Sequence, residues 1–279
     1  MLQDAGWASY LAARRAALAS CADADPASIG RAEQRLAAYL GLAPQDARRQ
    51  ARRNHLLAAD AAFHDQLLGS GRIDILRTLI DQGARVPALP RTAGGSVAIS
   101  LHYGPATSIL PLCLARASRT GQIAAFAVIQ NSHRDPAVML SPQRQAELSA
   151  HGFPLIDLDI ARLGEVGALR RALAILRAGG TALIFVDGQL PPADAKRTIA
   201  CRLGRGALAL ADGAAWLARS ANVPLLPLLV RPRHDIHGVE AMPAARAEDA
   251  ARAYQALIDL AMPSDPAPWS RWAASAEHF

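Results

Sequence analysis

Five short apolar segments, separated by helix-length stretches, follow residue 95 and constrain the fold more than any other feature of the sequence. The segments span residues 96–101, 122–130, 153–158, 181–186 and 223–230. Helices are predicted over 105–117, 141–150, 163–178, 206–220 and 246–260, and a further short strand over 197–203. Alternating strands and helices are typical of a mainly parallel sheet covered by helices on both faces. The sequence therefore predicts an α/β fold.

The first ninety residues are different, because their patterns predict only helices. These cover about 11–22, 26–40, 43–69 and 74–82, and Pro87, Pro90 and Gly94-Gly95 form a linker after them. The apolar stripes of such helices need a packing partner. We therefore expect residues 1–90 to be a helical segment packed on an α/β core of residues 91–279, in a single domain.

The chain carries a formal net charge of +6, yet its composition argues against nucleic acid as a specific partner. Lys196 is the one lysine among 30 basic residues, which is typical of compositional bias, and most arginines are expected on solvated helix faces. Four of them, Arg48, Arg49, Arg52 and Arg53, crowd the start of the third helix. Aromatic residues make up only 5%, so base-stacking platforms are not expected.

No membrane-spanning or secretory segment is predicted. Residues 92–115 contain no formally charged side chain, but Gly94-Gly95, His102 and Gly104-Pro105 divide them into a strand, a turn and a helix. No basic and then apolar leader follows Met1. We expect a cytoplasmic protein or one peripheral to the inner membrane.

Two strand ends carry side chains suited to catalysis. His102 follows the strand 96–101, and Asp187-Gly188-Gln189 follows the strand 181–186. Active sites of open α/β sheets lie beyond the carboxyl ends of the strands, where a histidine can act as a base and an aspartate can orient it. The alternatives are a histidine that caps a helix and an aspartate that serves a turn.

A basic segment follows the second strand end. Lys196, Arg197, Arg202 and Arg205 lie around Gly204 and Gly206, before the predicted helix 206–220, and suggest an anion site at its first turn. The glycine spacing fits neither a Walker loop nor a dinucleotide fingerprint, and no Gly-x-Ser-x-Gly elbow is present. The cysteines and histidines show no spacing that predicts a metal site.

Four segments together resemble the bacterial lipid A late acyltransferases of the lysophospholipid acyltransferase superfamily. They are AISLHYGP, FVDGQLPP, the run from Cys201 to Val230 and the tail PAPWSRWAASAEHF. The resemblance covers roughly residues 30–279 and rests on the order and spacing of these segments. It implies transfer of an acyl group from an acyl carrier protein or CoA thioester to a hydroxyl or amine of a lipid or small molecule. It also implies His102 as general base, no covalent acyl-enzyme and no cofactor.

The sequence departs from the family pattern at two important positions. In the His-x4-Glu/Asp motif of the family the acid directly follows the four intervening residues, and that position is Thr107 here. Gln130 stands where the family has an arginine. We expect Asp187 or another carboxylate to replace the lost acid. Candidate substrate-binding residues are Tyr103, Thr107, Gln130, Gln189, Lys196, Arg202 and Arg205.

Two other functions remain open at this point. The first is a degenerate relative that binds an acyl chain or carrier protein without catalysis, favoured by the missing acid and arginine. The second is a hydrolase or transferase that uses His102 with Cys113 or Ser108. Retention of His102 and of the Asp-Gly-Gln segment favours the acyltransferase.

Overall fold

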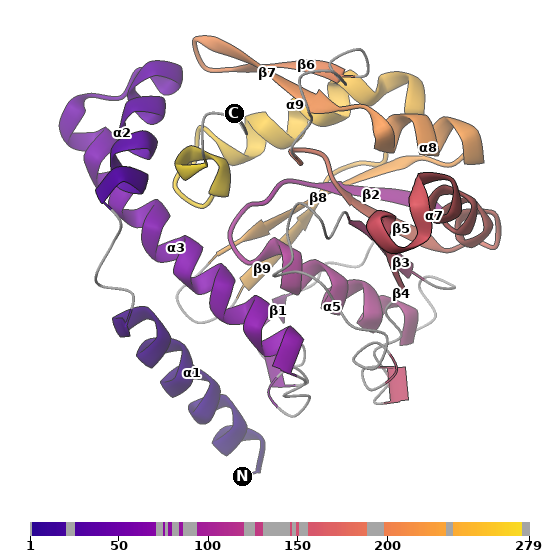
Figure 1. The fold of residues 1–279 in the computed structure, drawn as a ribbon, viewed down its shortest axis with the longest axis horizontal. Helices are drawn as coiled ribbons and strands as arrows, with labels where there is room; N and C mark the ends of the chain where they lie inside the picture. The colour runs from indigo at the N-terminus through magenta and orange to yellow at the C-terminus, as the bar shows by residue number, and fades with distance from the viewer. Residues whose placement is uncertain are drawn as a thin grey trace.

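The computed structural model describes residues 2–20, 26–70, 75, 78–79, 84–85, 94–119, 126–130, 146, 149–150, 156–188, 198–232 and 237–274. They form an α/β fold in which helices surround a mostly parallel sheet and an N-terminal helical segment packs on it (Figure 1). The fold class predicted from the alternating pattern is confirmed. Of the predicted helices 74–82 and 141–150, only a few residues are described.

Seven strands form the main sheet, in the order β1-β9-β8-β2-β5-β3-β4. Five of them run parallel: β8 (Leu225–Arg231), β2 (Ser96–Ser100), β5 (Thr181–Phe185), β3 (Phe126–Gln130) and β4 (Ile156–Asp159). β9 (His237–Ala241) pairs antiparallel with β8, and β1 (Ala84–Arg85) pairs with β9. Neither β9 nor β1 was predicted from the sequence.

Side chains alternate between two hydrophobic clusters, one on each face of the sheet. In β2, Val97 and Ile99 face one cluster and Ala98 faces the other. The first cluster contains buried residues of α7 (Ile160–Arg177), α8 (Gly213–Ala221) and α9 (Ala250–Ala261), and the second contains those of α5 (Ala106–Arg119). Burial on both faces explains why the parallel strands read as continuous apolar runs.

The N-terminal helices pack on both sides of this core. They are α1 (Leu2–Ser20), α2 (Pro26–Leu40) and α3 (Pro44–Ser70). α3 runs past the core, with Ala47 and Ala51 in the first cluster and Phe63 and Leu67 in the second (Figure 1). α2 and α3 also lie against the short helix η5 (Ser270–Ala273) near the C-terminus. A 3-10 turn, η4 (Ala247–Asp249), precedes α9.

The prediction of a helix over 206–220 is wrong in its first part. Residues 206–211 form β7 (Gly206–Ala211), which pairs antiparallel with β6 (Thr198–Leu203) in a two-stranded hairpin. Gly204 has φ +57° in the turn, a conformation that glycine adopts without strain. The alternating Ala-Leu-Ala-Leu pattern of β7 has the period of a strand, and the helix-forming tendency of alanine and leucine hid it.

Among the helices that the structure describes, none combines the length and apolar character needed to cross a bilayer.

Candidate active site

The register of the sheet places His102 opposite Asp187. β2 and β5 are parallel neighbours, and Ser100 is paired with Phe185 at their carboxyl ends. His102 and Asp187 each lie two residues beyond that pair, so the two side chains leave the sheet at the same edge. The two residues proposed from separate strand ends are therefore brought together by the fold.

Asp187 holds His102 through both its ring and its backbone. His102 Nδ1 lies 2.7 Å from Asp187 Oδ1, and the His102 backbone N–H donates to the same carboxylate at 3.1 Å and 2.9 Å. Asp187 is 7% exposed, while the His102 side chain is 21% exposed. The carboxylate is thus fixed in the interior, and the imidazole that it orients reaches the surface.

Two residues of the C-terminal tail complete the surroundings of this pair. The buried Trp269 donates its indole N–H to Asp187 Oδ2 at 2.7 Å. Arg271 Nη2 lies 3.4 Å from His102 Nδ1, and Arg271 Nε lies 3.9 Å from Asp187 Oδ2. Arg271 Nε is buried and has no hydrogen-bond partner among the described residues. The Ser270 backbone N–H donates to the carbonyl of His102, so the tail is tied to the same turn.

The charges around Asp187 keep it ionised. Burial by itself would raise the pKa of this carboxyl, but the charge and hydrogen bond of His102, the charge of Arg271 and the Trp269 indole outweigh burial. The pKa of Asp187 is therefore well below its ordinary value. An ionised Asp187 accepts a hydrogen bond from His102 Nδ1–H, and this tautomer has the lone pair on Nε2. That nitrogen has no protein partner among the described residues, so it is placed to accept a proton from a bound substrate.

Tyr103 and Thr107, both predicted as substrate-binding residues, have partners within the protein. Tyr103 is fully buried, and its hydroxyl donates to the backbone carbonyls of Asp265 and Ala261. Thr107 donates to Asp65 Oδ1 of α3 at 2.8 Å, and Ser108 donates to the same oxygen. The structure thus gives Tyr103 a role in anchoring the tail and turns Thr107 toward α3.

Two of the four cationic residues predicted to bind an anion are described, whereas Lys196 and Arg197 lie outside the described residues. Arg202 and Arg205 lie on the β6–β7 hairpin, so the proposed site at the first turn of a helix after Gly206 is corrected. Gln130 ends β3, the parallel strand beyond β5. The position of its side chain lies outside the described residues, as do Gln189 and Lys196.

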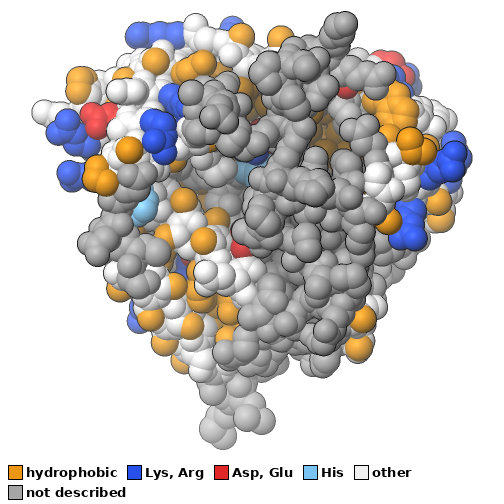
Figure 2. All heavy atoms as spheres, viewed as in Figure 1, with side chains coloured by type: hydrophobic (Ala, Val, Ile, Leu, Met, Phe, Trp, Pro, Cys, Tyr) orange, Lys and Arg blue, Asp and Glu red, His pale blue; other side chains and the backbone are white. Residues whose placement is uncertain are grey.

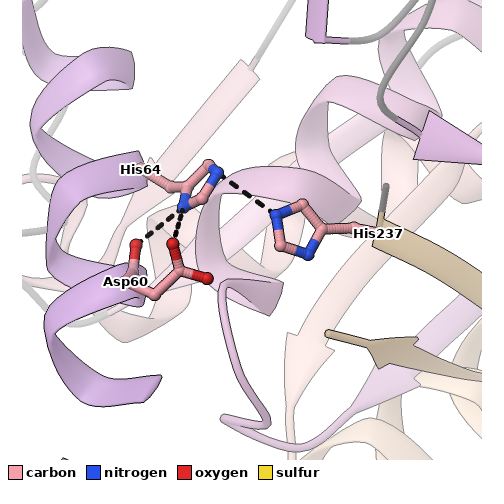
Figure 3. A group of neighbouring side chains, drawn as sticks. All are labelled: Asp60, His64 and His237. Atoms are coloured by element: carbon pink, nitrogen blue, oxygen red, sulfur yellow. Dashed lines mark hydrogen bonds and ion pairs between the residues drawn. The ribbon is translucent and has the colours of Figure 1, made fainter. Parts of the chain in front are cut away.

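A second group of titratable side chains, Asp60, His64 and His237, is buried between α1, α3 and β9 (Figure 3). His64 Nδ1 faces the backbone carbonyl of Asp60 at 2.7 Å, and its Nε2 lies 2.9 Å from the Tyr10 hydroxyl and 3.3 Å from His237 Nε2. Two imidazoles and a carboxylate are a donor set that zinc accepts.

A cation in that cluster is disfavoured by Arg14. Its guanidinium donates to both oxygens of Asp60, at 2.6 Å and 2.7 Å, within the same buried space. A divalent cation bound to Asp60 would therefore lie beside an existing buried positive charge. Burial also lowers the pKa of His64 and lowers that of His237 to about 3, so both rings are neutral at neutral pH. We interpret the cluster as a hydrogen-bond network that fastens α1 to the core.

Two residues considered as nucleophiles are unsuited to that role. Cys113 is 2% exposed, and burial raises the pKa of its thiol to about 12. Ser108 is fully buried and donates its hydroxyl to Asp65. Neither forms a hydrogen bond with His102 among the described residues, which weighs against covalent catalysis by these side chains.

Trp269, Arg271 and Asp65 were not proposed as site residues from the sequence. Trp269 and Arg271 belong to the tail PAPWSRWAASAEHF, which contributed to the family resemblance. This resemblance was the sequence signal that could have identified them as site residues. No sequence signal marked Asp65 as a site residue, because it is one of several acidic residues on a helix.

No protein-family model matches the chain, and no curated protein has a sequence detectably similar to it.

Proposed function

We propose that the protein is an acyltransferase, a divergent relative of the lipid A late acyltransferases, that moves an acyl group from a thioester to a hydroxyl or amine. The donor is an acyl carrier protein or CoA thioester, and the acceptor is a lipid or a small molecule. The observation that carries this proposal is the His102–Asp187 pair at the carboxyl edge of a parallel sheet, with Nδ1 bound and Nε2 unpaired among the described residues.

The reaction requires one base and no covalent intermediate. His102 Nε2 removes the proton of the acceptor O–H or N–H as the acceptor atom attacks the thioester carbonyl carbon. The oxyanion that forms collapses and breaks the C–S bond, and the departing thiolate takes the proton from the His102 imidazolium. The products are an ester or amide and a free thiol. Asp187 stabilises the imidazolium and fixes its tautomer, as an orienting carboxylate does in related base mechanisms.

Arg271 supplies the positive charge that the family pattern places after the second strand. Its guanidinium contacts His102, and its buried Nε has no hydrogen-bond partner among the described residues. Fixed cationic donors beside a base stabilise negative charge that develops during reaction. We therefore assign to Arg271 the electrostatic role for which Gln130, a neutral side chain, is unsuited.

The acyltransferase fits the site better than a covalent hydrolase does, because Cys113 and Ser108 are buried and engaged elsewhere. A binding protein without catalysis would have no need for a buried, ionised carboxylate that accepts three hydrogen bonds and orients a partly exposed imidazole. The three donors are the His102 backbone N–H, the His102 ring and the Trp269 indole, and the Arg271 guanidinium adds a positive charge 3.9 Å away.

The test is mass spectrometry of acceptors after incubation with acyl carrier protein and CoA thioesters. We expect the acceptor mass to rise by the acyl group with the wild type and with His55→Ala, a histidine of α3 outside the pair. His102→Ala should remove the product while its circular dichroism spectrum is retained. Product formation by His102→Ala at the wild-type rate, or none by the wild type with any donor, would reject the proposal.

A further inference from the structure

The first half of α3 carries four arginines within six positions: Arg48, Arg49, Arg52 and Arg53. The side chains of Arg48, Arg49 and Arg53 are 62%, 75% and 47% exposed. The four arginines line a surface groove of about 470 Å³ together with Pro44, Gln45 and Leu56. The helix thus presents a row of guanidinium groups to solvent.

The β6–β7 hairpin adds two arginines from a distant part of the sequence. Arg202 lines a groove of about 630 Å³ that Arg49 also lines, so hairpin and helix border the same depression. The Arg205 backbone N–H donates to Tyr39, and its guanidinium packs over Gly41, where a Cβ would come within 2.5 Å of it. We call these six residues the arginine face: Arg48, Arg49, Arg52, Arg53, Arg202 and Arg205. Figure 2 shows basic side chains on the side of the molecule where α2 and α3 lie, and others on the opposite edge.

The arginine face is only partly neutralised by the protein itself. Exposed pairs join Arg48 to Glu33, Arg49 to Asp46 and Arg53 to Asp265. Neither Arg52 nor Arg202 forms an ion pair with any described residue. Exposed ion pairs contribute about 0–1 kcal/mol, so these guanidinium groups can exchange their partners for carboxylates of another molecule.

The arginine face borders the segment that builds the active site. Arg53 is paired with Asp265, and the next residue, Asn54, donates to the carbonyls of Ala267 and Trp269. Trp269 in turn donates to Asp187. A molecule bound on the arginine face would therefore contact the outer side of the tail whose inner side holds the His102–Asp187 pair.

We propose that the arginine face docks an acidic carrier protein, which delivers the acyl thioester to His102; this inference rests on the proposed function. Guanidinium groups suit carboxylates because they donate two parallel hydrogen bonds. A membrane is disfavoured as the occupant, because a surface helix held at a bilayer buries an apolar face in addition to its charged groups, and the arginine face offers little apolar surface. Among the described residues, the exposed large hydrophobic side chains are Leu56 on α3 and Val166 on the distant α7.

The experiment measures binding without catalysis. Fluorescence anisotropy of a labelled holo-acyl carrier protein, with no acyl group, gives its Kd for the full-length protein at low and at moderate salt. We expect Arg49→Glu combined with Arg52→Glu to raise the Kd by about 10-fold or more, since a tenfold change corresponds to about 1.4 kcal/mol. The matched control combines Arg170→Glu with Arg171→Glu, two exposed arginines of α7, and should change the Kd by less than about 2-fold.

The possible outcomes separate this inference from the proposed function. The docking surface is supported if the wild type binds the carrier, if salt weakens this binding and if the α3 variant loses it. That conclusion holds even if no acyl transfer is found, because the absence of transfer would reject only the proposed function. An equal loss in both variants, or no carrier binding by the wild type, would overturn the docking surface. The docking surface would also be overturned if the wild type bound phosphatidylglycerol vesicles and not the carrier, and the α3 variant lost this vesicle binding. In that case the occupant of the arginine face would be a membrane.

Discussion

The hydroxyl of Thr107 donates a hydrogen bond to the carboxylate of Asp65, with 2.8 Å between Oγ1 and Oδ1. Thr107 stands where the resembled family has the acid that orients its histidine, and here that position is turned toward α3. Asp187 occupies the place beside His102 Nδ1 instead. The orienting carboxylate is thus supplied by a neighbouring strand and not by the helix that follows the histidine.

Restoring the family acid should therefore be harmful. Thr107→Glu would place a second carboxylate against Asp65 and remove one of its hydrogen-bond donors, at a cost of about 1–3 kcal/mol in the free energy of unfolding. The acyl-transfer rate should stay flat or fall. Thr107→Ser keeps the hydroxyl and should cost about 1 kcal/mol for the lost methyl group. Urea denaturation measures both, and a rate increase in Thr107→Glu would contradict the assignment of Asp187.

The contribution of Asp187 can be measured by removing its charge. Asp187→Asn presents an amide to His102 Nδ1, which favours the tautomer whose Nε2 carries the proton and cannot act as a base. We expect acyl transfer to fall by about 10²–10⁴-fold, the usual contribution of general base catalysis. Steady-state kinetics with a saturating donor checks this. Wild-type activity in Asp187→Asn would show that another group orients the imidazole.

Two tryptophans of the tail offer a matched pair of substitutions. Trp269→Phe removes the indole donor to Asp187, and hydrogen bonds to charged groups contribute about 1.5–3 kcal/mol. Trp272→Phe removes a donor to the carbonyl of Pro266 in the same tail, at about 0.5–1.5 kcal/mol.

Both variants should be less stable in urea, but only Trp269→Phe should also lower kcat once the protein is folded, by up to about 100-fold. Equal kcat values for the two variants would mean that the indole of Trp269 has a structural role alone.

The His64–His237 network should make the protein sensitive to acid. The pKa of His237 is about 3 in the folded protein, because burial and the neighbouring His64 disfavour its charged form, and about 6.5 in an unfolded chain. The unfolded state therefore binds more protons between pH 6.5 and 3, so stability is full above 6.5 and is lost as the pH falls. The limiting slope is about 1.4 kcal/mol per pH unit for one proton.

Urea denaturation at several pH values tests this linkage. His237→Gln retains an N–H donor but does not titrate, so its free energy of unfolding should depend less on pH between 6.5 and 4. Asp60, Arg14 and Tyr10 face the same rings and are unchanged in this variant. His55→Gln, on the same helix but outside the network, should keep the wild-type slope. Parallel pH profiles for the wild type and His237→Gln would contradict the linkage.

The sequence predicted the parallel strands and the two strand-end residues because those features are local. Buried strands appear in the sequence as apolar runs. Parallel neighbouring strands bring His102 and Asp187 to the same carboxyl edge of the sheet, and the conformation of the connecting loops does not change this. The prediction of a helix was wrong over residues 206–211, because alanine and leucine favour helices, whereas Gly204 and pairing with β6 favour a hairpin. Such tertiary pairing is not visible in a window of a few residues.

The remaining parts of the site depend on contacts between distant segments. Trp269 and Asp187 are 82 residues apart in sequence, and Thr107 and Asp65 are 42 apart. No periodicity or motif links residues over such separations, and a single sequence contains no covariation to reveal them. The arginine face was visible as a charged run on α3, but its continuation onto the hairpin required the fold.

The late position of Trp269 also orders the assembly of the site during synthesis. Ribosomes add about 5–20 residues per second, so the 82 residues between Asp187 and Trp269 take roughly 4–16 seconds to translate. During that interval β2 and β5 can already pair, but the indole that holds the buried carboxylate does not yet exist. A nascent chain therefore passes through a stage in which His102 and Asp187 are both present but the indole that donates to Asp187 is missing, and the hydrogen bonds of this carboxylate are complete only when the tail has left the ribosome.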